Sequence, residues 1–223
     1  VAMDMNASYD ILVRKHLPDA RIVYDRYHMQ AQFGKDVLGV VRLNEARAHK
    51  EKSDILRESL SQLQGEDRKQ AKEEARLERR KYTHVKRARW ALLKNSENLR
   101  EPQAAHLSEI LDAHSDLAVC YAMKEEMCGL FDLRDPMPAK LGWEKWFAAA
   151  KESNIPALVR FAELKEKRID GLIAHAVYPI STGRLEGFNN KIKVAKRLAY
   201  GYRDNHFFFT LVRFLSIPFP NFP

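Results

Sequence analysis

The chain has 223 residues, 45% of them hydrophobic, with 38 basic and 30 acidic side chains and a formal net charge of +8. This length accommodates one large domain or a core with a sizeable insertion, and the basic balance favours an anionic partner, most commonly nucleic acid. No apolar run is long enough to span a bilayer. The two cysteines, Cys120 and Cys128, do not make a disulfide framework or a zinc site and indicate a reducing compartment.

The first 25 residues predict a parallel strand–helix–strand unit. Val1–Met5 indicates the end of a strand, and Asn6 suits the N-cap of a short helix. The β-branched and aromatic run Ala20–Asp25 predicts a second strand, and short connections make the unit parallel. Each strand ends at an acid, Asp4 or Asp25, where open α/β sheets place ligands. The alternative is that both aspartates only start turns.

A long helical region follows, with no strand pattern between about residues 45 and 175. Its first helix is expected from Arg26 to about Leu43. The run Arg68–Lys81 has alternating charges and is typical of a solvated helix face. A phosphate-binding surface is the alternative for this run.

The second half of the helical region predicts a hydrophobic core. Helices are expected over residues 107–133 and 155–173, and residues 135–138 are expected to form a connector. Between the connector and the second of these helices, three aromatic side chains fall on one helical face: Trp143, Trp146 and Phe147. At this spacing we expect them to be core residues rather than a stacking platform for bases.

The stretch Ser181–Arg203 predicts a basic amphipathic helix. Small residues at its start suit a helix N-terminus, and Gly201 suits a left-handed cap at its end. Helical spacing places four apolar side chains on one face: Leu185, Phe188, Ile192 and Ala195.

A second face of the same helix carries polar groups. Glu186 is followed at i+4, i+7 and i+11 by Asn190, Lys193 and Arg197, so one carboxylate heads a column of amide and cationic groups. Such a pattern suits a metal ligand beside a phosphate backbone. The alternative is a solvated helix whose acid complements the helix dipole.

These carboxylates suggest phosphoryl transfer on DNA. That chemistry uses two divalent ions about 3.5–4 Å apart, and magnesium prefers carboxylate oxygens. Asp4 and Glu186 are the candidate ligands, and Asp25 is a candidate third acid. His28 is placed to hydrogen-bond Asp25 or to orient a phosphate. The sequence contains no nucleophile elbow, phosphate-cradling Gly-rich loop or dinucleotide fingerprint.

Several segments resemble the bacterial insertion-sequence transposases of the ISL-three family. They are Asp4–Tyr9, Pro18–His28, Leu92–Leu99, Ser181–Lys193 and Lys196–Arg203. The resemblance spans nearly the whole chain, and its closing motif is highly specific. It implies a DDE transposase with a ribonuclease-H-like fold.

The resemblance also implies residue roles. Asp4 would be the second acid of the catalytic triad and Glu186 the third, and both would bind Mg²⁺ or Mn²⁺. Asp25 and His28 match an Asp-x-x-His signature and would form a supporting shell. The implied reaction is water-driven nicking at the element's end, followed by attack of the freed 3′-hydroxyl on target DNA. We expect DNA contacts from Asn190, Lys193, Lys196, Arg197 and Arg203.

Two departures from the family pattern accompany the resemblance. Thr182 stands where the family usually has asparagine. The first acid of the triad would lie before Val1, together with the family's N-terminal DNA-binding regions. We therefore expect a C-terminal fragment that is catalytically incomplete alone.

The expected fold is mainly α with a small parallel β remnant. A partial ribonuclease-H-like α/β core at residues 1–44 and 175–223 would be interrupted by an all-helical insertion at 45–174. We expect DNA as partner, both transposon ends and target, with a homodimer or higher oligomer in synapsis. No membrane and no small-molecule cofactor are expected, and the location would be the bacterial cytoplasm, at the nucleoid. The alternative is a non-catalytic DNA-binding or assembly module, in which Asp4 and Glu186 lie far apart.

Overall fold

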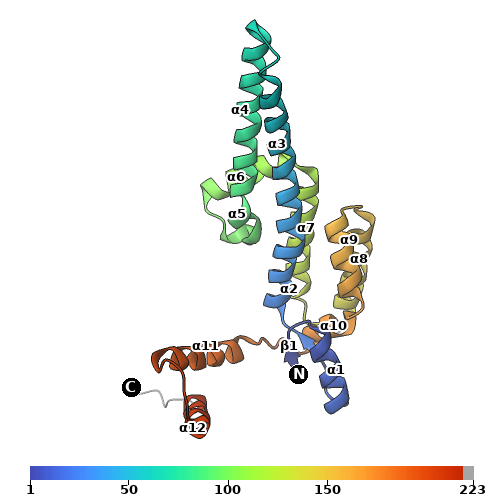
Figure 1. The fold of residues 1–223 in the computed structure, drawn as a ribbon. Helices are drawn as coiled ribbons and strands as arrows, with labels where there is room; N and C mark the ends of the chain where they lie inside the picture. The colour runs from blue at the N-terminus through green and yellow to red at the C-terminus, as the bar shows by residue number, and fades with distance from the viewer. Residues whose placement is uncertain (218–223) are drawn as a thin grey trace. The chain divides into compact units, whose positions relative to one another are not determined.

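The computed structural model describes residues 1–217, apart from the side chain of Arg184. It divides into two compact units, each described by itself: Met3–Pro179 with Val1, and the described residues from Ile180 onward with Ala2. The described residues are mainly helical with one two-stranded parallel sheet, as the sequence predicted (Figure 1). No helix among them is long and apolar enough to cross a membrane.

The sheet is shorter than the sequence suggested. Strand β1 (Ala2–Met3) pairs with β2 (Val23–Tyr24) through hydrogen bonds from the Val23 and Asp25 amides to the Val1 and Met3 carbonyls, at 2.9 and 3.1 Å. Helix α1 (Ala7–His16) connects them and is capped by the Asn6 side chain, as predicted. The predicted strand–helix–strand unit is therefore confirmed.

A single long helical path leaves the sheet. It consists of α2 (Arg26–Phe33), a π-helical turn (Gly34–Leu38) and α3 (Gly39–Ser59), so it extends beyond the expected end near residue 43. The π-helical turn contacts the neighbouring α5 (Arg89–Leu93): a Cβ at Gly34 would lie 2.4 Å from a methyl carbon of Leu93. Glycine at this position therefore permits a close approach between the two helices.

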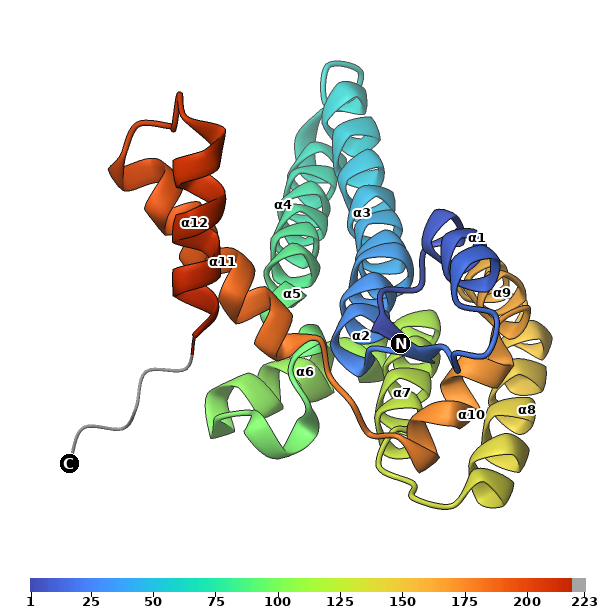
Figure 2. The same ribbon diagram turned by 90° about the horizontal axis from the view of Figure 1, so that it is seen from below.

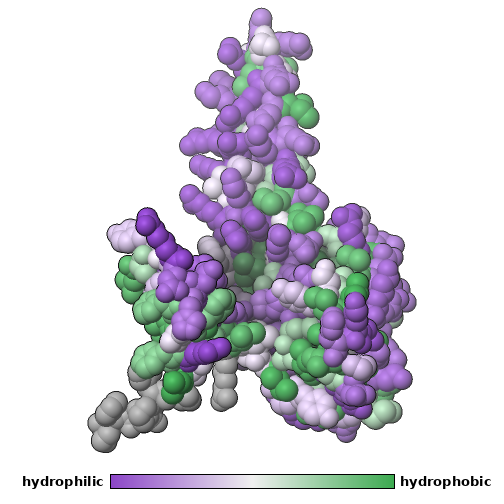
Figure 3. Space-filling view, turned by 60° about the horizontal axis from the view of Figure 1, so that its bottom comes forward, coloured by the Kyte–Doolittle hydropathy of each residue, from purple (hydrophilic) through white to green (hydrophobic). Residues whose placement is uncertain are grey.

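Helix α4 (Gly65–Arg87) returns alongside α3, and the two form a helical hairpin. Figures 1 and 2 show the two helices side by side. The interface uses small buried side chains, including Ala46 and Ala75, and the Ser53 hydroxyl donates to the Ala75 carbonyl at 2.8 Å. The surface of the hairpin is mainly hydrophilic (Figure 3). The charged run Arg68–Lys81 is thus a helix with one face packed on α3.

The predicted helix over residues 107–133 is two helices. After α5, a short 3-10 turn (Ser96–Asn98) leads into α6 (Glu101–Ala113), and α7 (Ser115–Leu130) follows. His114 separates α6 from α7 with an extended backbone, at φ −135° and ψ 91°. The periodicity continues across this bend because both helices bury apolar side chains.

The last part of the first unit contains α8 (Pro136–Glu152), α9 (Pro156–Glu166) and α10 (Ile169–Val177). Two predictions here were wrong. Residues 136–138 begin α8 because the Asp135 side chain caps it and proline suits the first turn. The expected helix over 155–173 is divided at Arg168, whose backbone is not helical.

The predicted aromatic core is confirmed. Trp143, Trp146 and Phe147 are fully buried, and the Trp146 indole N–H donates to the Met123 carbonyl of α7 at 2.8 Å. Phe33 of α2 packs against Trp146 with ring centroids 6.1 Å apart. This cluster therefore joins the start of the long helical path to α7 and α8.

The second unit is a pair of helices, α11 (Gly183–Leu198) and α12 (Asn205–Ser216). The predicted cap at Gly201 needs a correction. The first left-handed residue after α11 is Tyr200, at φ 51°, and Gly201 follows at φ 99°. The Gly201 amide donates to the Lys196 carbonyl at 3.0 Å, so both residues together end the helix.

Candidate functional site

Asp4 follows β1 directly, so it lies at the carboxyl end of a parallel strand. Its carboxylate Oδ1 contacts His28 Nε2 at 2.9 Å, and the Asp4 side chain remains 42% exposed. His28 belongs to the first turn of α2, which begins after the neighbouring strand β2. The two strand ends thus bring a carboxylate and an imidazole together at one edge of the sheet.

Asp25 occupies the equivalent position after β2 and is nearly fully buried. Its carboxylate accepts hydrogen bonds from the Tyr27 and His28 amides, at 2.8 and 3.3 Å, and so caps α2. The sequence suggested that the His28 ring could bond Asp25, whereas the structure pairs the His28 backbone with Asp25 and its ring with Asp4. Asp25 therefore fixes the helix that presents His28.

A polar network behind the strands was not predicted. The Tyr24 hydroxyl donates to Asp10 Oδ1 at 2.7 Å, and Arg168 Nε forms an ion pair with Asp10 Oδ2. Burial first, and then the hydrogen bond to Asp10, raises the pKa of the Tyr24 hydroxyl above its usual range. The network joins α1, β2 and the start of α10, and so holds β2 in place.

Gly171 lets α10 approach this network. A Cβ at this position would lie 2.3 Å from the Tyr24 ring. The only sequence signal for this contact was an isolated glycine within an apolar helical pattern.

His175 of α10 also lies behind β2. It is buried, and its ring packs edge-on against Phe131 with centroids 5.1 Å apart. Burial lowers the pKa of His175, so the ring is neutral near pH 7. Helix α10 continues to Val177, beyond the expected helix end at residue 173, so His175 belongs to this helix.

The second unit carries Glu186 in the first turn of α11, where its side chain is half-buried. Thr182 precedes the helix and does not cap it with its side chain. The predicted apolar face is half-buried at Phe188, Ile192 and Ala195, but Leu185 is 58% exposed.

The predicted DNA-contacting side chains all lie on the surface of this unit. Lys196 also extends over the ring of Phe208 in α12, with Nζ 5.5 Å from the ring centroid. The exposed set consists of Asn190, Lys193, Lys196, Arg197 and Arg203.

The geometry groups the predicted site residues into two sets. Asp4, Asp25 and His28 lie together in the first unit. Glu186 and the basic column lie in the second unit. The pairing of Asp4 with Glu186 stays a prediction.

Comparison with known proteins gives the context for these groups. A family model of the DDE class and ISL3 type, described as "Transposase", matches residues 1–212. The chain belongs to this transposase family. The ISL3-type chain is 34% identical over 213 residues to the transposase for insertion sequence element IS1001 of Bordetella parapertussis. It is 31% identical over 199 residues to the transposase for element IS1557 of Mycobacterium tuberculosis.

The alignments cover most of this transposase chain but less than half of the relatives. The IS1001 alignment includes 96% of the chain and 46% of the relative, and the IS1557 alignment includes 86% and 42%. No solved structure matches the chain. The predicted resemblance to the family is confirmed.

Proposed function

We propose that this chain contributes two catalytic carboxylates, Asp4 and Glu186, to a DDE transposase that cleaves and joins DNA at the ends of an insertion sequence. The observation that carries the proposal is the arrangement around Asp4. A half-exposed carboxylate stands at the carboxyl end of a parallel strand, and His28 holds one of its oxygens at 2.9 Å. Ligand sites of open α/β sheets form at such edges.

The residues around Asp4 suit a hard divalent cation. Asp4 offers carboxylate oxygen at an exposed position, which is the ligand type that Mg²⁺ and Mn²⁺ prefer. Asp4 and Glu186 would hold the ions. Bound metal would activate the attacking oxygen and stabilise the leaving oxygen of the phosphodiester.

The chain's other residues position these groups. Asp25 caps α2, and α2 in turn presents the His28 ring that orients Asp4. Lys193 and Arg197, which are exposed on α11, would bind the phosphate backbone next to Glu186. The reaction would begin with water-driven nicking at the element's end and continue with attack of the freed 3′-hydroxyl on target DNA.

This function goes together with a proposed division of the chain. Residues 1–44 and 175–223 would form part of a ribonuclease-H-like core, and residues 45–174 an all-helical insertion. A third carboxylate would come from outside these 223 residues, so the chain alone would be inactive. The full protein would act as a homodimer or higher oligomer, because synapsis joins two ends.

The test is strand cleavage by the full-length protein on DNA carrying the element's ends, with Mg²⁺. Asp4→Asn and Glu186→Gln are each expected to lower the cleavage rate at least about a thousandfold, because each removes a metal ligand. Binding to the same DNA without metal should change little.

Glu163→Gln is the matched control, since Glu163 is exposed on α9 and belongs to neither group of predicted site residues. It should cleave at the normal rate. Cleavage within tenfold of normal by Glu186→Gln would contradict the catalytic role and favour a non-catalytic DNA-binding or assembly module. Cleavage by the purified 223-residue chain would contradict its proposed incompleteness.

A further inference from the structure

The helical hairpin carries a concavity lined largely by arginine. It lies beside α4, between α3 and α6, and has a volume of about 690 Å³. We call it the arginine groove, and its lining residues are Arg57, Arg76, Arg79, Arg80, Arg87, Thr83, His84 and His106. Among the described residues that line it, none is acidic.

The five arginines are not used to hold the hairpin together. None of them forms an ion pair with a described side chain, although Arg79 lies over the Tyr82 ring, 4.8 Å from its centroid. Several acids of α4 pair with lysines instead. Glu74 contacts Lys52 at 3.3 Å, and buried Glu78 contacts Lys81 at 2.8 Å. The hairpin therefore separates paired charges at its interface from unpaired cations in the groove.

Such an accumulation of cations opposes folding. Like charges three or four residues apart on a helix, such as Arg76 with Arg79 or Arg80, destabilise it by about 0.2–0.5 kcal/mol per pair. Guanidinium groups stay charged at any physiological pH, so the repulsion cannot be relieved by deprotonation. A bound anion would relieve it, and the planar fork of arginine suits phosphate oxygens.

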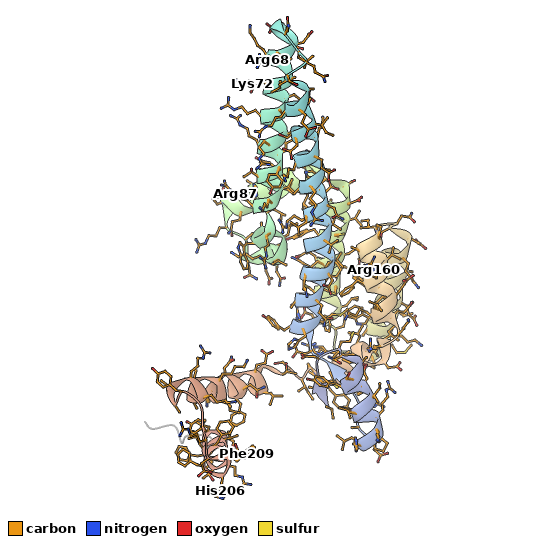
Figure 4. All side chains as sticks on the ribbon, in the orientation of Figure 1. Arg68, Lys72, Arg87, Arg160, His206 and Phe209 are labelled. Carbon is orange, nitrogen blue, oxygen red and sulfur yellow. The ribbon has the colours of Figure 1, made fainter. Side chains whose placement is uncertain are left out.

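The basic surface continues along α4 beyond the groove. Arg68, Lys72, Arg76 and Arg80 follow one another at four-residue spacing, and all four are exposed. Figure 4 shows Arg68, Lys72 and Arg87 distributed along the hairpin from its tip toward its base. At a rise of about 1.5 Å per residue, Arg68 to Arg87 spans roughly 28 Å, the length of about eight base pairs. This extent fits a polyanion better than a single phosphate ion.

A metal ion is the competing ligand at the inner end of the groove. His84, His106 and Glu109 place one ligand atom each within 4.8 Å of one another, and His84 Nε2 lies 3.4 Å from Glu109 Oε2. However, Arg80 and Arg87 line the same concavity as the two histidines and would repel a cation. The charge around the cluster thus favours an anion.

We propose that the arginine groove and its continuation along α4 bind the phosphodiester backbone of DNA, as a second DNA surface besides α11. The choice of DNA among polyanions rests on the proposed transposase function. The groove reads no sequence, because guanidinium contacts to phosphate position a duplex without specifying bases. Its role would be to hold flanking DNA against the helical insertion.

The test measures binding of the 223-residue chain to a fluorescent 20-base-pair duplex in EDTA, at several salt concentrations. The groove variant is Arg76→Gln/Arg80→Gln/Arg87→Gln. It should lower the slope of log affinity against log salt by about two to three units, close to one per lost phosphate contact. At about 0.1 M salt its affinity should fall at least tenfold.

The matched control is Lys140→Gln/Lys145→Gln/Arg160→Gln, which removes the same charge from exposed positions of α8 and α9. Its salt slope should change by less than one unit. Circular dichroism melts should show that both variants fold. A third variant, Lys193→Gln/Arg197→Gln, measures the contribution of α11 separately.

Equal salt slopes for the groove and control variants would overturn the proposal, as would absence of duplex binding by the unmodified chain. The proposal would also be overturned by two results together: micromolar Zn²⁺ binding that His84→Gln abolishes, and an unchanged DNA affinity of the groove variant. Displacement of the duplex by millimolar inorganic phosphate at constant ionic strength would also overturn the proposal. Because no metal is present in the DNA assay, its result does not depend on whether Asp4 and Glu186 form a catalytic site.

Discussion

The α3–α4 hairpin and the α7–α8 core join helices by different means. In the core, large aromatic rings such as Trp143, Trp146 and Phe147 fill the space between helices. In the hairpin, small residues and the buried Glu78 of α4 hold the two helices together. Glu78 contacts His49 and Lys52 of α3, and Lys81 of its own helix also pairs with it. The aromatic core is stabilised by apolar burial and does not depend on the surface charges. The hairpin is stabilised by ion pairs at the interface between its helices, and the exposed charges on its other face are therefore available to bind a ligand.

The largest expected effect is in the core. Trp146→Ala should lower the free energy of unfolding by about 4 kcal/mol, because it removes a fully buried indole, leaves a cavity and frees the Met123 carbonyl. Urea denaturation of the 223-residue chain measures this change. Trp90→Ala is the matched control, since Trp90 is 65% exposed, and it should cost less than about 1 kcal/mol. Equal losses for the two variants would refute the assignment of the core.

The next effect is at the hairpin interface. Burial alone would raise the pKa of Glu78, but hydrogen bonds from Lys81 and His49, and their charges, lower it to about 2. Glu78→Gln should therefore cost about 2 kcal/mol at pH 7, since it removes a charged hydrogen-bond acceptor from a buried position. Urea denaturation at several pH values measures the loss.

The pH dependence of this loss has a definite sign. A carboxylate whose pKa is depressed on folding stabilises the protein above its unfolded pKa, near 4.5, and this stabilisation disappears as the pH falls toward 2. The difference in stability between the unmodified chain and Glu78→Gln should therefore be complete above about pH 5 and shrink below it. The exposed Glu73→Gln on the same helix is the control and should show only a small change. A constant difference for Glu78→Gln from pH 7 to 3 would contradict the charged interface.

The smallest effect on stability is expected in the arginine groove. Arg76→Gln/Arg80→Gln/Arg87→Gln should change the free energy of unfolding by less than about 0.5 kcal/mol, or raise it slightly, because like charges are removed from an unpaired surface. The measurement is the same urea titration. If the free energy of unfolding fell by more than about 2 kcal/mol, these arginines would stabilise the hairpin. That result would contradict the separation between paired charges at the interface and unpaired arginines in the groove.

The sequence alone determined the local features of this protein. The parallel strand–helix–strand unit, the Asn6 cap and the aromatic face of α8 each depend on a few neighbouring residues whose preferences agree. Family membership also followed from short segments such as Ser181–Lys193, whose resemblance to the family agrees with the match of the family model over residues 1–212.

The tertiary structure decided the contacts between distant segments. The His28 ring contacts Asp4, and the Asp25 carboxylate accepts from an amide of the helix that it caps. Helix breaks at His114 and Arg168 escaped prediction, because apolar periodicity continues through a bend when both sides are buried. The Asp10–Tyr24–Arg168 network and the arginine groove join residues from several elements, and periodicity within one helix carries no information about such partners. Sequence patterns thus specified which face of each helix is apolar and which is polar. Tertiary packing decided which other segment each face contacts.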